Sequence, residues 1–299
     1  MSGAEAPYAL NGSTRVSISG SFTADLKVAS DWYIGRRRAM ISLGPIGRRH
    51  CTYRCAFCYV QGDFPSYPSY DASVLLAWLK GRLEEFDTVY VSGDTDSFAP
   101  PRTYQGLALL EALLVLKKDV LFTTRAVLSA DARNRMSSIA SEYQQAGLRL
   151  IACISISQLS HPELEPPPIP SPGKRIEQMS YLKKLGLVTA LTIRPFIPGI
   201  DPSEYASIAS LGARAADVII GGDLYSDFKG IVRDRIESAG LSMAGEADSI
   251  GPLYFSTNES HWFTHKHPAA EGAVAAAAAH AGVPFFMGSE PAIDFIRSQ

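Results

Sequence analysis

The stretch that decides the fold runs from Met40 to Tyr59 and reads MISLGPIGRRHCTYRCAFCY. It opens with a short apolar run, Met40–Leu43, and continues into a loop that carries three of the chain's four cysteines. Further short apolar runs follow downstream, at Thr88–Val91, Val120–Thr123, Leu150–Ile154, Val188–Ile193 and Val218–Ile220. Strands that are apolar on both faces are typical of a parallel sheet covered by helices. The pattern therefore predicts six parallel strands, of which Met40–Leu43 is the first.

Segments with helical periodicity separate these runs, and Ser, Asp and Gly residues mark their ends. Strands that alternate with helices at this spacing predict right-handed βαβ units, so we expect an α/β fold with a partial (βα)6 barrel. The expected divisions are an N-terminal extension (1–37), the barrel (38–240) and a C-terminal segment that caps the substrate site (241–299). A Pro-rich connection, His161–Gly173, is predicted to be an extended surface loop.

The cysteines form a C-x3-C-x2-C array of Cys51, Cys55 and Cys58, directly after the first predicted strand. Three close thiolates on one loop can bind three corners of a cubic iron–sulfur cluster and leave the fourth iron without a protein ligand. An open metal position can bind a small molecule. Three alternatives stand beside this interpretation: a zinc site, for which the neighbouring His50 is poorly placed as a fourth ligand, a disulfide that leaves one thiol over, and simple packing.

The composition bounds the class of protein. The chain has 299 residues, is 46% hydrophobic, and carries 28 Lys and Arg against 30 Asp and Glu, a formal net charge of −2. These values exclude a mainly disordered chain and a small disulfide scaffold, and they give no general attraction to nucleic acid or to an anionic membrane. Residues 1–20 lack the pattern of a secretory signal, and Ala273–Ala279 is too short to span a bilayer. We therefore expect a cytoplasmic protein with reduced thiols and no membrane partner.

The cysteine array, with Phe57 between its last two cysteines, resembles the hallmark of the radical S-adenosylmethionine (radical SAM) superfamily. The resemblance covers about residues 38–225 and includes the place of the array after the first strand. It implies two cofactors, a [4Fe–4S] cluster and S-adenosylmethionine, whose amino and carboxylate groups bind the open iron. It also implies an external electron donor of the flavodoxin or ferredoxin type, and a 5′-deoxyadenosyl radical that abstracts hydrogen from the substrate.

The turn after the second predicted strand also matches the superfamily. Gly93 and Asp94 occupy the place of a Gly-Gly-Glu-like motif that holds the methionine ammonium, although Asp94 replaces its second glycine. A glycine lets backbone carbonyls approach the ligand, and a carboxylate can pair with the cation. The plainer alternative is an ordinary strand-end turn.

Two serines and two arginines complete the cofactor site that the resemblance implies. Ser155 and Ser157 lie where relatives place polar groups near the ribose, and the alternative is a hydroxyl bonded to backbone. Arg175 and Arg194 occupy positions that often carry a carboxylate-binding arginine, whose two parallel hydrogen bonds suit the methionine carboxylate. For Arg175 the alternative is a surface arginine.

The candidates for catalytic work beside the cofactors are Asp96, Tyr225 and His265. The segment Tyr254–His267 is expected to cap the open barrel and line the substrate site, with a polar surface loop as the alternative. Further candidates in or near these loops are Asp223, His261, Trp262 and His267. An Ala-rich helix and a last short strand near Val283–Met287 are predicted to follow.

The sequence thus predicts a radical SAM enzyme that acts on a small organic molecule, with specialised metabolism as the expected setting. The runs Val91–Pro100 and Leu121–Arg125 also resemble, over a short length, the spore photoproduct lyase-like branch. One alternative function is therefore a nucleic-acid lesion repair lyase that binds DNA through Arg36–Arg38, although solvated arginines flanking a strand are the plainer interpretation and no nucleic-acid partner is expected. Another alternative is a non-catalytic zinc-binding module. Cys153 is expected to be a small core residue.

Overall fold

The computed structural model describes residues 26–29, 32–43, 51–61, 69–243, 247–250 and 262–299. Most of the N-terminal extension lies outside these ranges, and so do His50 and His261. What the sequence predicts for those residues stays a prediction.

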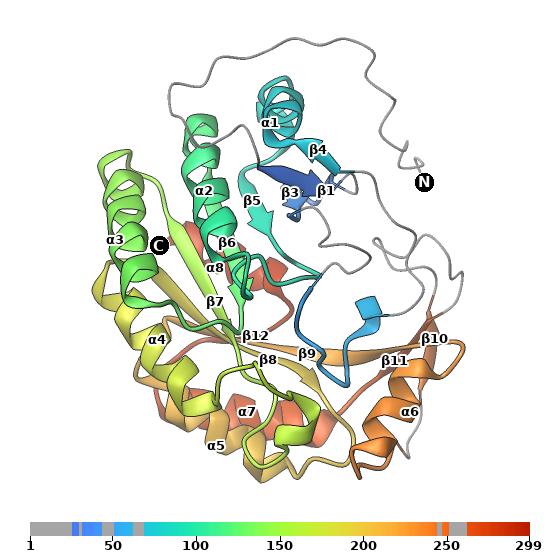
Figure 1. The fold of residues 1–299 in the computed structure, drawn as a ribbon. Coiled ribbons are helices and arrows are strands. Elements are labelled where there is room, and N and C mark those ends of the chain that lie inside the picture. Colours follow the sequence, from blue (N-terminus) through green and yellow to red (C-terminus); the bar gives the residue numbers. More distant parts are fainter. Residues whose placement is uncertain (1–25, 30–31, 44–50, 62–68, 244–246, 251–261) are drawn as a thin grey trace.

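Six parallel strands form the centre of the main sheet, and each overlaps one of the predicted apolar runs (Figure 1). In their order across the sheet they are β3 (Arg38–Ile41), β5 (Thr88–Val91), β6 (Asp119–Thr124), β7 (Leu150–Ser155), β8 (Val188–Phe196) and β9 (Val218–Asp227). Helices connect consecutive strands from β5 onward. The predicted α/β partial barrel is confirmed.

The sheet continues beyond these strands at both edges. At one edge, β2 (Tyr33–Gly35) pairs antiparallel with β3. At the other edge, β12 (Phe285–Met287) pairs with the first half of β9 as a seventh parallel strand, and β11 (Trp262–His265) pairs antiparallel with its second half. β10 (Asp248–Ile250) then pairs with β11, while β1 (Lys27–Ala29) and β4 (Ser69–Asp71) form a separate two-stranded sheet.

Strands β10, β11 and β12 of the C-terminal segment therefore belong to the same sheet as the barrel strands. The last short strand lies where the sequence predicts it, as β12. The alternative of a polar surface loop is wrong for residues 262–265, because they form a strand in which Trp262 and His265 are buried. Strand pairing with β9 supplies the backbone partners that a surface loop would have found in water.

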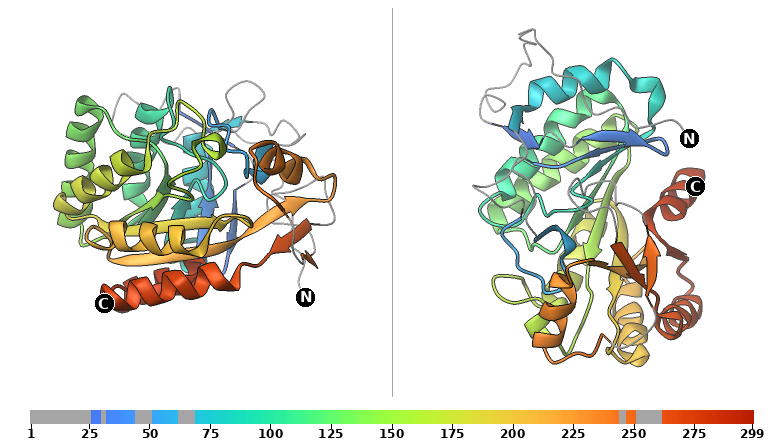
Figure 2. Two further views of the ribbon diagram at one scale, coloured as in Figure 1. Left: turned by 90° about the horizontal axis from the view of Figure 1, so that it is seen from below. Right: turned by 90° about the vertical axis from the view of Figure 1, so that its right-hand side faces the viewer.

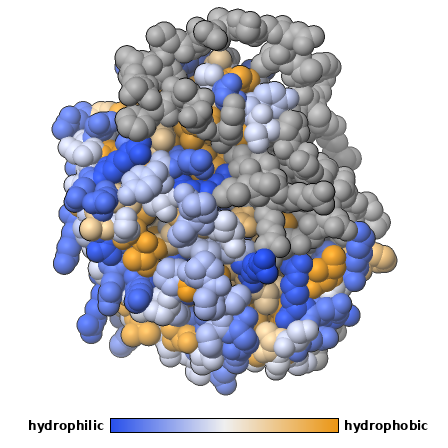
Figure 3. All heavy atoms as spheres, viewed as in Figure 1, coloured by the Kyte–Doolittle hydropathy of each residue, from blue (hydrophilic) through white to orange (hydrophobic). Residues whose placement is uncertain are grey.

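Eight α-helices lie within the described residues, and none of them is long and apolar enough to cross a membrane. They are α1 (Ala72–Lys80), α2 (Thr103–Leu113), α3 (Ala130–Gln145), α4 (Pro172–Lys184), α5 (Pro202–Ala213), α6 (Ile231–Ser238), α7 (Pro268–His280) and α8 (Ser289–Ser298). The outward faces of α3 and α4 are largely polar (Figure 3). Ser129 caps α3 as predicted, whereas the Asp71 side chain makes no capping bond to α1.

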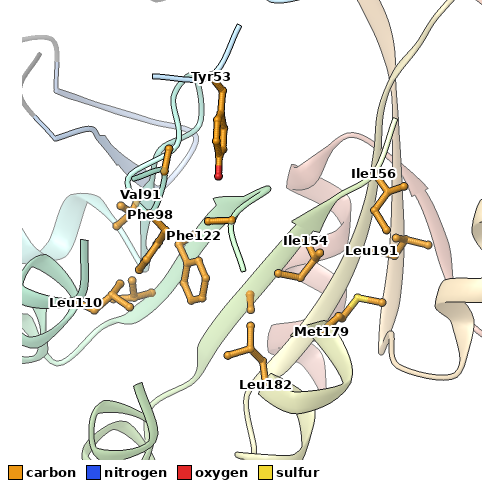
Figure 4. Close-up of a cluster of buried hydrophobic side chains, with 14 of the residues drawn as sticks. Tyr53, Val91, Phe98, Leu110, Phe122, Ile154, Ile156, Met179, Leu182 and Leu191 are labelled. Carbon is orange, nitrogen blue, oxygen red and sulfur yellow. The ribbon is translucent and has the colours of Figure 1, made fainter. Parts of the chain in front are cut away.

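Two apolar cores hold the sheet. The larger one lies between the sheet and the helices that connect its strands, where Phe98 and Phe122 pack with ring centroids 4.8 Å apart (Figure 4). In the same core, Met179 and Leu182 of α4 lie beside strands β7 and β8 (Figure 4). Phe122, Met179 and Leu182 are apolar positions of predicted strands and helices, and burial of such side chains is the main source of stability.

The smaller core lies on the other face of the sheet, where α8 packs (Figure 2). Ile293 and Ile296 of α8 contact strand residues that include Leu121, Ile151 and Val218. All three come from the first half of their strands. The helix therefore covers the start of the barrel interior and leaves the carboxyl ends of the strands to other residues, which is where parallel sheets bind ligands.

Candidate active site at the carboxyl edge of the sheet

The cysteine loop lies against the carboxyl ends of the strands. The amide of Ala56 donates to the Leu164 carbonyl at 2.9 Å, which ties the loop to the connection between β7 and α4. From the far side of the sheet, Arg235 of α6 donates through Nη1 to the Cys58 carbonyl at 3.2 Å. Tyr53 and Phe57 are buried. The loop is thus fixed from both sides by residues distant in sequence.

The three thiols are free and close enough to influence one another electrostatically. Burial raises the pKa of Cys51 to about 12 and also raises the pKa values of Cys55 and Cys58. Buried thiols of this kind become thiolates when a metal centre displaces their protons. Three thiols on one loop therefore fit the ligand set of a [4Fe–4S] cluster, whose iron ions would balance the negative charge of the thiolates.

A single metal ion fits less well. Among the described residues, no group of three or more His, Cys, Asp or Glu side chains is arranged to hold one ion. Thiolates that bind different irons of a cube do not have to converge on one point, so this arrangement agrees with a cluster. Cys153 lies in the smaller core with Tyr90 and Leu121, apart from the array.

Arg125, which follows β6, lies directly over the cysteine loop. Its guanidinium carbon is 5.3 Å from the centroid of the Phe57 ring, a cation–π geometry. Its Nε donates to Glu165 Oε1 at 2.8 Å, and its Nη2 reaches Ser157 Oγ and the Arg194 carbonyl, both at 3.3 Å. No role for Arg125 follows from the sequence patterns above, although it lies just beyond a predicted strand, as Arg194 does.

Glu165 is the second residue that sequence reasoning missed, because it lies in the connection predicted to be an extended surface loop. That prediction is wrong for this part of the connection: a short 3₁₀ helix, Pro162–Leu164, turns the chain inward, and both Leu164 and Glu165 are buried. Although burial opposes it, the charges of Arg175 and Arg125 hold the pKa of Glu165 below its usual value. Glu165 is therefore an ionised carboxylate inside the protein.

Arg175 pairs with this carboxylate. Its Nη2 lies 2.5 Å from Glu165 Oε2, and its Nη1 lies 3.1 Å from Oε1 and 2.6 Å from the Ser155 carbonyl. The side chain is fully buried, so the alternative of a surface arginine is wrong. Two predicted cofactor residues, Ser155 and Arg175, are in contact, but these bonds direct the Arg175 guanidinium at the protein itself.

Arg194 lies in a different environment, near the carboxyl end of strand β8 rather than in the first turn of a helix. Its guanidinium is half-buried, and it makes no hydrogen bond or ion pair with the described residues. Gly222 of β9 leaves room for it, since a Cβ at that position would overlap the Arg194 side chain. Its charge acts on Tyr59 and Asp223, so the guanidinium lies between the cysteine loop and β9.

The turn after β5 contains a residue with an unusual backbone conformation and a carboxylate that accepts a hydrogen bond. Buried Ser92 adopts a left-handed backbone conformation (φ = 63°), which is uncommon for a residue other than glycine and typical of functional turns. Asp94, two residues on, accepts a hydrogen bond from Ser42 Oγ at 2.7 Å. The predicted turn is present, and it presents Gly93 and Asp94 at the same edge of the sheet as the cysteines.

The proposed catalytic residues have dissimilar surroundings. Asp96 is buried and accepts from the amides of Phe98 (2.9 Å) and Arg125 (2.7 Å) and from Thr124 Oγ1 (2.9 Å), so its oxygens hold two loops together. His265 is buried with Nε2 2.7 Å from Ser226 Oγ, and burial lowers its pKa. A catalytic role for either residue stays a prediction, and their bonds give both a structural task.

The aromatic candidates lie nearer the cysteines. Tyr225 packs edge-on against Tyr59, the residue after Cys58, with ring centroids 6.2 Å apart. Trp262 approaches the same ring at 6.1 Å. His267 instead caps α7, since its Nδ1 accepts from the Ala270 amide at 3.4 Å. The structure therefore brings Tyr225 and Trp262, but not His267, to the cysteine loop.

The basic cluster Arg36–Arg38 lies at the amino end of β3, at the opposite edge of the sheet from the cysteine loop. Arg36 pairs with Glu290 at 2.5 Å, Arg37 with Asp87 at 2.5 Å, and Arg38 donates to Ser289 Oγ at 3.0 Å. The contacts of Arg36 and Arg38 join this edge of the sheet to α8, whereas Arg37 pairs with Asp87 just before β5. Arg36 and Arg37 thus already have acidic partners for charges that a phosphate backbone would otherwise neutralise.

The partial barrel that carries the cysteine loop at its carboxyl edge has a fold similar to that of a solved radical SAM enzyme, spore photoproduct lyase. No protein-family model matches the chain, and no curated protein matches it. Among solved structures it is similar to spore photoproduct lyase complexed with dinucleoside spore photoproduct (13% identity, TM-score 0.56) and to a variant of that enzyme with bound AdoMet and the same dinucleoside (13%, 0.57). Both matches cover 80% of this chain and 74% of the other. A match to Streptococcus suis SuiB bound to S-adenosylmethionine covers 64% of this chain and 44% of the other (17%, 0.45).

Proposed function

We propose that this chain is a radical SAM enzyme. The observation that carries the proposal is the set of three free thiols on one partly buried loop, at the carboxyl edge of a sheet with the fold of spore photoproduct lyase. Cys51, Cys55 and Cys58 would hold the [4Fe–4S] cluster. When bound, the cluster and S-adenosylmethionine supply a 5′-deoxyadenosyl radical that abstracts hydrogen from the substrate.

The chain's own residues would bind and orient the methionine part of the cofactor. The Arg194 guanidinium makes no hydrogen bond or ion pair within the described residues, so it is suited to receive the carboxylate through two parallel hydrogen bonds. Asp94 and the carbonyls of its strained turn are suited to the ammonium. The phenol rings of Tyr59 and Tyr225 border the same region and are suited to screen it from water.

The substrate would be a small organic molecule, and the electron would come from an external flavodoxin- or ferredoxin-type donor. The pairing of Arg36–Arg38 with residues of the protein itself supports a small molecule over nucleic acid. The likeness to spore photoproduct lyase favours one second candidate, a nucleic-acid lesion repair lyase. That candidate predicts tight DNA binding that weakens steeply with salt, whereas the small-molecule enzyme is indifferent to DNA.

The test is anaerobic reconstitution with iron and sulfide, followed by incubation with S-adenosylmethionine and a reductant. We expect iron and sulfide in cluster stoichiometry and formation of 5′-deoxyadenosine. Cys55→Ala should abolish both, while Cys153→Ala, which alters the cysteine of the smaller core, should retain both. Zinc without sulfide would contradict the proposal and support the zinc-binding module.

A further inference from the structure

Arg125, Glu165 and Arg175 form a buried charged group, which we call the arginine–glutamate triad. The two guanidinium groups share one carboxylate, with N–O distances of 2.8 Å for Arg125 and 2.5 Å for Arg175. The side chains are 17%, 1% and 0% exposed, in chain order. Two positive charges and one negative charge leave the triad with a net charge of +1.

The triad is in direct contact with the cysteine loop. Arg125 covers the Phe57 ring, and the carbonyl of Leu164, the neighbour of Glu165, accepts from the Ala56 amide. Arg125 is also close enough to Cys55 and Cys58 to lower the pKa values of both thiols, against the larger effect of their burial. The Arg125 guanidinium therefore lies beside the part of the loop that carries Cys55 and Cys58.

Stability alone does not explain this arrangement. A buried ion pair stabilises a fold little more than a well-packed apolar group of the same volume, because the charges lose their hydration. If the carboxylate served Arg125 alone, the pair would be neutral. Arg175 takes a share of Glu165, so a positive charge is left beside the cysteines, where the low-dielectric interior strengthens its effect.

We propose that the arginine–glutamate triad fixes a positive charge over Cys55 and Cys58 that raises the reduction potential of the cluster they hold. The inference rests on the proposed function. Three thiolates give the cluster unit a negative charge, and one-electron reduction by an external reductant makes that charge more negative. A fixed cation favours the reduced form, and Arg125 acts here as a positioning residue whose charge is kept in place by Glu165 and Arg175.

The experiment is a redox titration of the reconstituted full chain, monitored by electron paramagnetic resonance without S-adenosylmethionine. Arg125→Met should lower the ratio of reduced to oxidised cluster at a fixed potential about tenfold, equivalent to a shift of about 59 mV for one electron. The matched control is Arg135→Met, which removes an arginine paired with Glu111 by two bonds of 2.7 and 2.5 Å on α2 and α3. The control should keep the wild-type potential. Arg125→Lys retains the positive charge and should therefore have a potential close to that of the wild type.

A substitution that should shift the reduction potential in the opposite direction gives a second, independent test. Glu165→Gln removes the negative charge and should raise the potential. Electron paramagnetic resonance detects only the clusters that are present. The titration therefore gives the reduction potential even of a variant that binds the cluster in only a fraction of its molecules. A wild-type potential in both Arg125→Met and Glu165→Gln would overturn the inference. Absence of iron and sulfide from the wild-type chain would instead overturn the proposed function, so the two failures are distinguishable.

Discussion

The sequence predicts the same role for Arg175 and Arg194, but the structure places their guanidinium groups in different surroundings. Both are expected to bind a carboxylate at the same edge of the sheet. Arg175 is fully buried and binds Glu165 with two nitrogens, whereas Arg194 is half-buried and has no such partner among the described residues. The difference teaches that the role of an arginine at this edge of the sheet depends on whether the protein itself supplies a carboxylate for its guanidinium.

The largest expected effect of this difference is on stability. Glu165→Ala should lower the free energy of unfolding by about 3–5 kcal/mol, because it leaves two buried guanidinium groups without their carboxylate. Urea denaturation measures the change. The matched control is Glu111→Ala, whose partner Arg135 lies nearer the surface, and it should cost about 0–1 kcal/mol. Equal losses in the two variants would remove the distinction between buried and surface pairs.

The second effect is on cofactor binding. Arg194→Met should weaken binding of S-adenosylmethionine to the reconstituted protein about 10- to 100-fold, as expected for loss of a charged hydrogen-bonded pair. It should change the free energy of unfolding by no more than about 0.5 kcal/mol, because the guanidinium makes no hydrogen bond or ion pair with the described residues. Equilibrium dialysis and urea denaturation test the two halves. Unchanged affinity would show that Arg194 does not receive the carboxylate.

Gly222→Ala should have a milder effect in the same direction. The added Cβ overlaps the Arg194 side chain, which can move aside at some cost in its alignment. We expect an affinity for S-adenosylmethionine about 3- to 10-fold weaker, corresponding to roughly 0.6–1.4 kcal/mol. The control is Gly173→Ala in α4, where an added Cβ meets no atom within 4 Å. If both substitutions behave alike, the room that Gly222 provides has no bearing on the cofactor.

The smallest effect is a pH dependence of stability. The pKa of Glu165 is held below its usual value, so between the folded and unfolded pKa values the unfolded chain binds more protons. The stabilisation is complete above the unfolded pKa of about 4.3 and is lost as the pH falls through the folded value. The difference in unfolding free energy between wild type and Glu165→Gln should therefore shrink on acidification below about pH 4.3. Parallel curves would contradict the assignment of an ionised Glu165.

Local sequence patterns were enough to predict much of the fold and the placement of the three cysteines on one loop. The six parallel strands are apolar on both faces, and three cysteines at short spacing share one loop whatever the tertiary structure. The same rule that marks Arg194, a cation at the end of a parallel strand, also applies to Arg125 and could have found it.

Pairings between distant segments could not be predicted in this way. Glu165 is 40 residues from Arg125, and the prolines around it are typical of an exposed loop, although the 3₁₀ turn buries it. The pairing of residues 262–265 with β9 is likewise a long-range event, and it turns an expected loop into a strand. Each of these errors concerns a polar residue or polar segment that became buried through a partner far away in the chain.

The most direct test is the electron paramagnetic resonance spectrum of the reduced, anaerobically reconstituted protein, recorded before and after addition of S-adenosylmethionine. We predict the signal of a reduced [4Fe–4S] cluster that changes on addition, because three cysteines leave one iron open to the cofactor. The absence of a cluster signal, or a signal that S-adenosylmethionine leaves unchanged, would contradict the assignment of Cys51, Cys55 and Cys58 as ligands of an open cluster.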